Sequence, residues 1–91
     1  MSENEKALLR LTQELVRCES ITPDDAGCLD IITRELADLS FDINKFSSND
    51  VSNLWATHGS ESPIFVFAGH TDVVPPGPIN DWQYPPFNPT L

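Results

Sequence analysis

An unbroken apolar run, Ile64–Ala68, constrains the fold of this chain more than any other feature. Five apolar residues in a row, between the polar loop His58–Pro63 and Gly69, are typical of a β-strand that is buried on both faces. Such a strand needs a layer of other elements on each side. We therefore expect residues 64–69 to form the central strand of a sheet.

A first amphipathic helix is predicted over residues 3–18. Ser2 and Glu5 have the spacing of a capping box, in which a hydroxyl and a carboxylate bind free backbone N–H groups at a helix start. Apolar residues then recur at steps of three and four, which is the period of one helix face: Leu8, Leu11, Leu15 and Cys18.

A second helix is predicted over residues 25–39. Pro23 excludes a single continuous helix and favours an extended backbone at Thr22. Thr22 is predicted to cap the second helix, with Asp24 and Asp25 near the positive end of its dipole. The apolar face of this helix carries Leu29, Ile32, Leu36 and Leu39.

Two further strands are predicted between this helix and the apolar run. Residues 41–46 alternate between apolar and polar, Ser47–Asp50 has turn composition, and residues 51–56 form the next strand. Trp55 is expected to pack between sheet and helix. The order of two helices followed by three strands predicts an α/β or α+β layer.

Residues 75–91 differ from the rest of the chain because they hold six of its eight prolines. Repeated prolines exclude regular helix and central strand, so an extended segment is predicted. Its aromatic residues could line a substrate site or form an apolar flap over the core, and we expect the flap: Trp82, Tyr84 and Phe87. At 91 residues, the chain has room for one domain or part of one, residues 1–91.

Composition excludes several classes of function. The net charge is −9, and the five basic residues are scattered before residue 46, so no nucleic-acid or membrane partner is expected. The N-terminus is acidic and polar, unlike a secretory signal, and two cysteines, Cys18 and Cys28, are too few for a disulfide scaffold. We expect a reduced, cytoplasmic protein in which both cysteines are small core residues.

The residues most suited to chemistry are His70 and Asp72, directly after the apolar run. Ligands of α/β proteins gather at the carboxyl ends of strands, and a neutral imidazole there is a good metal ligand. Residues two apart in an extended chain point to the same side, so Asp72 could hold His70 by a hydrogen bond. The same two residues could also be a hydrogen-bonded pair that only closes a strand. Local physics leaves both interpretations open.

The motif Gly69–Gly77, with the proline and aromatic residues that follow it, resembles the first metal-binding signature of the zinc aminoacylase and carboxypeptidase superfamily. The pattern is most similar to the succinyl-diaminopimelate desuccinylase family. Ser20–Asp24 and Asn53–Ala56 also fall where such enzymes have similar residues. The resemblance implies an α/β fold, in which residues 1–91 form the N-terminal part of a mixed-sheet, exopeptidase-like catalytic domain.

The resemblance also implies a dinuclear amidohydrolase with two zinc ions, or cobalt, and a small-molecule substrate, N-succinyl-LL-2,6-diaminopimelate. His70 would be a metal ligand, and Asp72 the active-site carboxylate that orients it. The family's bridging aspartate, general-base glutamate and dimerisation domain have no counterpart in residues 1–91. We therefore expect a homodimer only for the complete enzyme, and an inactive chain on its own. The alternatives are a related deacylase or dipeptidase, or a small acidic interaction module without metal.

Overall fold

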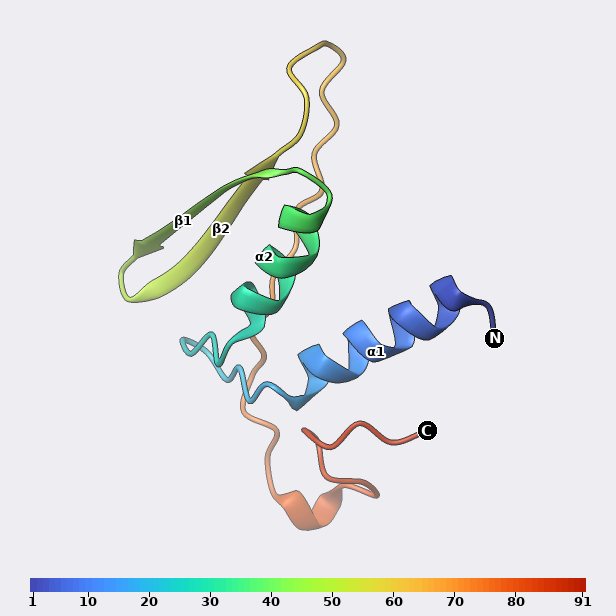
Figure 1. Ribbon diagram of the computed structural model, residues 1–91. Helices are drawn as coiled ribbons and strands as arrows, with labels where there is room; N and C mark the ends of the chain where they lie inside the picture. The colour runs from blue at the N-terminus through green and yellow to red at the C-terminus, as the bar shows by residue number, and fades with distance from the viewer.

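The computed structural model describes residues 1–91 as an open arrangement of two helices, one hairpin and a long irregular segment (Figure 1). Its radius of gyration is 15.5 Å, against about 12 Å for a compact chain of this length. Only two residues are buried, Cys28 and Ser20. The chain therefore has no extended core of its own, and neither helix combines the length and apolar character that crossing a bilayer requires.

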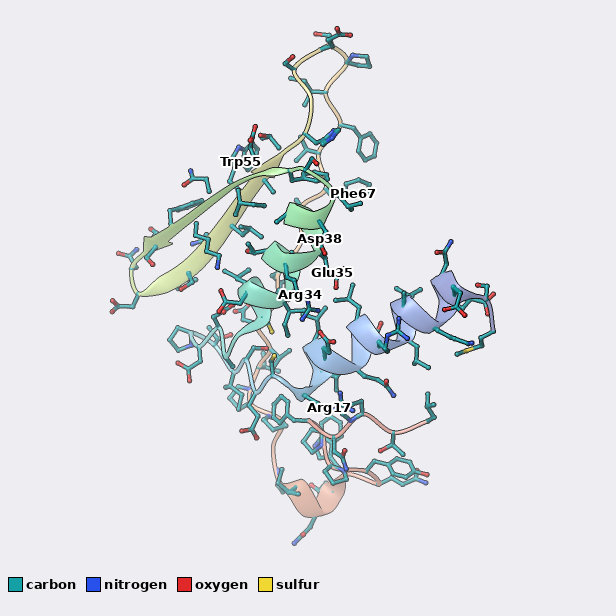
Figure 2. The ribbon with its side chains drawn as sticks, viewed as in Figure 1. Arg17, Arg34, Glu35, Asp38, Trp55 and Phe67 are labelled. Atoms are coloured by element: carbon teal, nitrogen blue, oxygen red, sulfur yellow. The ribbon has the colours of Figure 1, made fainter.

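Helix α1 spans Glu3–Arg17, which confirms the first predicted helix to within one residue. The Ser2 hydroxyl oxygen accepts the N–H of Glu5 at 3.1 Å, as the capping-box spacing predicts. No residue of α1 is buried, so its apolar stripe is only partly covered. Arg34 of the next helix, which is labelled in Figure 2, forms an ion pair of 2.6 Å with Glu14 of α1.

Helix α2 spans Cys28–Asp38 and begins three residues later than predicted. Ala26 and Gly27 have φ of 55° and 94°, a left-handed backbone that cannot belong to the helix. The expected cap at Thr22 is wrong, because the Asp25 carboxylate accepts the N–H of Leu29 at 3.1 Å and that of Gly27 at 3.2 Å. Asp25 thus satisfies N–H groups at the helix start that have no partner within the helix.

Strands β1 (Asp42–Ser48) and β2 (Val51–Thr57) form an antiparallel hairpin, which confirms the first two predicted strands. Asn49 and Asp50 connect them, and both have positive φ, 51° and 65°. Positive φ at both central residues is the geometry of the two-residue turn that matches the twist of a hairpin. Helix α2 lies beside this hairpin (Figure 1) and is linked to β1 by an ion pair between Asp30 and Lys45.

The predicted central strand is not formed. Residues 64–69 are extended, but they pair with neither edge of the hairpin, and the sheet has two strands. The side chains of Ile64, Phe65 and Phe67 are 83%, 81% and 92% exposed. A strand exists only through hydrogen bonds to a neighbour, and residues 58–72 make no backbone–backbone hydrogen bond. The apolar run therefore has the composition of a buried strand without the layers that would bury it.

Aromatic side chains that were expected in a core remain half-exposed. Trp55 is 54% exposed, beside an open apolar groove between the hairpin, the end of α2 and residues 63–67. Figure 2 shows Trp55 on the hairpin and Phe67 on the returning segment. In the last segment, Trp82 and Tyr84 are also about half-exposed, so they do not form the expected flap over a core. The Trp82 ring N–H donates instead to the Pro76 carbonyl at 2.9 Å, next to a single 3₁₀ turn at Ile79–Asp81.

The cysteines fit the expected small packed residues. Cys28 is 2% exposed, and Cys18 is half-buried with its thiol near the Glu14 carbonyl. Burial, together with the neighbouring Cys28 thiol, raises the pKa of Cys18 above its ordinary value of 9.0. Both thiols are free in the structure.

The unpaired segment predicts self-association. Exposed apolar strands without charge offer free N–H and C=O groups to other chains. We expect Phe67→Lys to lower the fraction of oligomer at a given concentration, measured by sedimentation velocity. Val74→Lys is the matched control, because Val74 is similarly exposed but lies outside the run. Equal effects of the two substitutions would contradict a role for the run.

The start of α2 gives a second prediction. Asp25→Ala removes the acceptor of the Leu29 and Gly27 N–H groups, so it should destabilise the chain by about 1 kcal/mol. Circular dichroism during thermal unfolding measures this loss. Asp24→Ala removes the neighbouring carboxylate, which makes none of these bonds, and should have less effect.

Candidate functional site

The candidate site is built where two distant segments meet, residues 20–22 and residues 71–73. Ile21 and Val73 form an isolated parallel bridge. The Val73 N–H donates to the Ser20 carbonyl at 2.9 Å, and the Thr22 N–H donates to the Val73 carbonyl at 3.0 Å. The buried Ser20 hydroxyl also donates to the Thr71 carbonyl at 2.8 Å. We call these contacts the 20–22/71–73 bridge, and they fix the backbone on which Asp72 lies.

His70 and Asp72 contact one another, as their spacing predicts. The Nδ1 atom of His70 lies 3.1 Å from Oδ1 of Asp72 and 3.0 Å from the Asp72 carbonyl oxygen. Both oxygens can only accept a hydrogen bond, so Nδ1 of the neutral ring must carry the proton. The other nitrogen, Nε2, then keeps its lone pair. The His70 side chain is 82% exposed, so this lone pair is accessible from solvent.

Asp72 is held by a second partner that sequence reasoning assigned elsewhere. The Thr22 hydroxyl donates to Oδ2 of Asp72 at 2.6 Å. This hydrogen bond is the largest cause that lowers the pKa of the Asp72 carboxyl below its ordinary value. Desolvation opposes it, and the contact with His70 lowers the pKa further. The signal for Thr22 was present in the sequence, because Pro23 makes the preceding residue extended and leaves its hydroxyl free for a distant acceptor.

The chemistry of this pair fits a divalent transition metal. An accessible imidazole nitrogen, with the opposite N–H bound to a carboxylate, is the usual state of a histidine that binds zinc. Nowhere in residues 1–91 do three or more His, Cys, Asp or Glu side chains gather as a metal cluster requires. A Cβ at Gly69 would meet no atom within 4 Å, so no other part of residues 1–91 approaches the backbone closely at this position.

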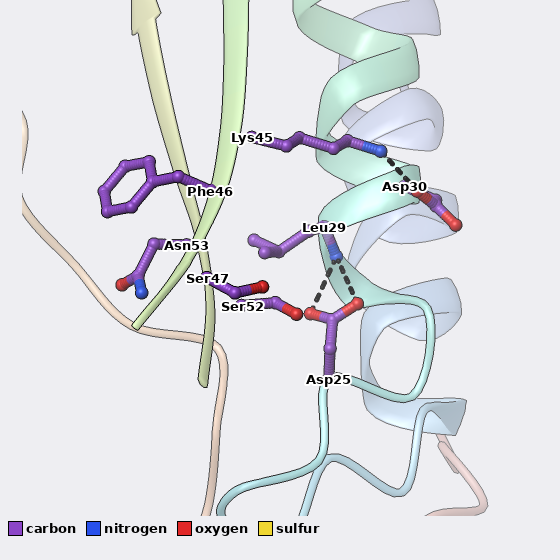
Figure 3. Close-up of a pocket in the computed structure, with 8 residues that line it drawn as sticks. All are labelled: Asp25, Leu29, Asp30, Lys45, Phe46, Ser47, Ser52 and Asn53. Carbon is purple, nitrogen blue, oxygen red and sulfur yellow. Dashed lines mark hydrogen bonds and ion pairs between the residues drawn. The ribbon is translucent and has the colours of Figure 1, made fainter. Parts of the chain in front are cut away.

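Apart from the His70 site, a polar pocket lies between the start of α2 and the hairpin (Figure 3). Its charged groups already have partners within the chain. Asp25 accepts backbone N–H groups of α2, and Asp30 pairs with Lys45. This pocket therefore offers no free charge to a ligand. The other histidine, His58, lies in the exposed loop after β2 with its ring 5.1 Å from that of Phe41.

No protein-family model matches the chain. Curated proteins match it over nearly all of its length. Succinyl-diaminopimelate desuccinylase of Thiobacillus denitrificans is 55% identical over 83 residues, and that of Dechloromonas aromatica 51% over 83. The desuccinylase of Azoarcus sp. strain BH72 is 50% identical over all 91 residues. The chain spans only 21%, 22% and 24% of the length of these three relatives, respectively.

These relatives are all desuccinylases by name, so the chain is related to a class of hydrolases. More specifically, it is homologous over nearly its whole length to a part of the succinyl-diaminopimelate desuccinylases. This finding confirms the resemblance expected from Gly69–Gly77 and its surroundings.

The lowered pKa of Asp72 predicts how the site responds to acid. Because the folded-state pKa lies below the ordinary 3.8, the Thr22 contact contributes stability above about pH 4 and is lost as the pH falls through the folded-state value. We expect the ¹³C signal of the Asp72 side-chain carboxyl, followed by NMR, to titrate with a midpoint below 3.8. A midpoint above 3.8 would contradict this assignment.

Proposed function

We propose that residues 1–91 form the His70-bearing part of a metal-dependent amidohydrolase. Its reaction is the hydrolysis of N-succinyl-LL-2,6-diaminopimelate to succinate and LL-2,6-diaminopimelate, on the bacterial route to lysine. The names of the relatives support the substrate, and identity of about half over nearly the whole chain supports the transfer. The proposal places the enzyme in the cytoplasm and the complete protein in a homodimer.

One observation carries the metal part of the proposal. Nδ1 of His70 faces two oxygen acceptors of Asp72, so in the neutral ring the exposed Nε2 is the nitrogen that carries the lone pair. The proposed roles follow: His70 is a ligand through Nε2, and Asp72 fixes the tautomer and the plane of the ring.

Zinc, or cobalt in its place, would polarise the amide carbonyl and lower the pKa of a bound water. The residues of this chain prepare the site for it. The Asp72 carboxylate stabilises the positive charge that the imidazole gains as a ligand, and the 20–22/71–73 bridge fixes the backbone beneath both groups. The proposal assigns the second zinc ion, the remaining ligands and the general base to residues outside the 91 described here.

A chimera tests this function directly. In it, residues 1–91 replace the matching stretch of the Azoarcus relative, which aligns with the entire chain. We expect the chimera to hydrolyse the succinylated substrate, and the 91-residue chain alone to show no hydrolysis. In the chimera, His70→Ala should abolish hydrolysis and lower the zinc content, measured by atomic absorption.

Two further variants sharpen the test. Asp72→Asn should keep the fold but reduce turnover about 10- to 100-fold, because an amide cannot hold the imidazole in the same charge state. His58→Ala is the matched control, because His58 lies in an exposed loop away from His70 and Asp72, with its ring next to that of Phe41. It should leave hydrolysis and zinc content unchanged. Full hydrolysis and full zinc content in the His70→Ala chimera would refute the assigned role.

A further inference from the structure

The Thr22 hydroxyl is committed to Asp72 rather than to a helix start. Its oxygen lies 2.6 Å from Oδ2 of Asp72, and 3.2 Å from the carbonyl of Val73. A hydroxyl has one hydrogen to donate, and the shorter contact to a charged acceptor is the stronger of the two. The hydroxyl therefore binds the carboxylate oxygen that does not face His70.

The position of Thr22 is fixed independently of this hydrogen bond. Its backbone N–H donates to the Val73 carbonyl, and the neighbouring Ile21 forms the parallel bridge with Val73. Ser20, at 3% exposure, anchors the same segment through its bond to the Thr71 carbonyl. The hydroxyl is thus presented to Asp72 from a backbone held by three other hydrogen bonds.

The pair of His70 and Asp72 needs such a restraint. His70 is 82% exposed and Asp72 43%, and an exposed ion pair or hydrogen bond contributes little by itself. The terminal torsion of an aspartate is broad, so its carboxylate turns easily when only one oxygen is held. With Oδ2 bound to Thr22, Oδ1 stays directed at Nδ1 of the imidazole.

We infer that Thr22 is a positioning residue, whose hydroxyl orients the Asp72 carboxylate and thereby keeps the His70 ring in the tautomer with Nε2 free. What this positioning role means for metal binding rests on the proposed function. The contacts from Thr22 through Asp72 to His70 are independent of the proposed function, and their effect on the His70 tautomer can be measured in the metal-free protein.

The test uses the ¹⁵N-histidine-labelled 91-residue chain at about pH 8.5, where an imidazole is neutral. The ¹⁵N shifts of the His70 ring report the ratio of its two tautomers. We expect the Nδ1–H form to dominate in the unmodified chain. Thr22→Val keeps the shape but removes the hydroxyl, and should lower the ratio of the Nδ1–H to the Nε2–H form at least twofold. An unchanged ratio in this variant overturns the inference.

Thr22→Ser and Thr12→Val separate positioning from folding. Ser keeps the hydroxyl without the methyl group, so the tautomer ratio should return to that of the unmodified chain. Thr12→Val removes a hydroxyl that donates only within α1, to the Leu8 carbonyl, and should leave His70 unchanged. A nuclear Overhauser contact between Ile21 and Val73 shows that the bridge is intact in each variant. A shifted ratio in Thr22→Ser with the bridge intact also overturns the inference.

Zinc alone, added to the same samples, distinguishes this inference from the proposed function. We expect a zinc-dependent shift at Nε2 of His70 that requires several-fold more zinc in Thr22→Val than in Thr22→Ser. If the tautomer ratio responds to Thr22→Val and zinc never shifts Nε2, the positioning role stands and the metal role of His70 fails.

Discussion

The parallel contact between residues 20–22 and residues 71–73 is the interaction on which the rest of the site depends. Few other contacts join the end of the first helix to the second half of the chain, and only Ser20 and Cys28 are buried anywhere. The contact places Thr22 against Asp72, and Asp72 against His70. Without it, the imidazole would be one more exposed side chain on an extended segment. The chemistry of the site thus derives from backbone pairing rather than from burial.

The elements that sequence predicted well are those determined by local contacts. Ser2 caps α1, and the spacing of its leucines predicts how far the helix extends. Asn49 and Asp50 adopt the positive φ that the hairpin turn requires. The pairing of His70 with Asp72 also follows from local geometry, because side chains two apart in an extended chain share a side.

Elements that depend on distant partners were predicted poorly. The composition of residues 64–69 indicates burial, but burial requires neighbours, and residues 1–91 leave this run largely exposed and without a paired strand. Thr22 was predicted to cap α2 from its neighbours in the sequence alone. In the structure its hydroxyl binds Asp72, 50 positions away, and Asp25 caps the helix instead. A threonine before a proline has several possible acceptors, and only the three-dimensional arrangement selects one.

The separation along the chain has a consequence for how the site is assembled. Residues 20 and 71 lie 51 positions apart, so joining them closes a loop that costs roughly 3–4 kcal/mol in chain entropy. The four hydrogen bonds that close it return about 0.5–1.5 kcal/mol each, which leaves a narrow margin. The helix and hairpin inside the loop can form during synthesis, whereas the imidazole acquires its orientation only after Val73 has emerged from the ribosome. In the finished protein, transient opening of this loop is the motion that would release the ring.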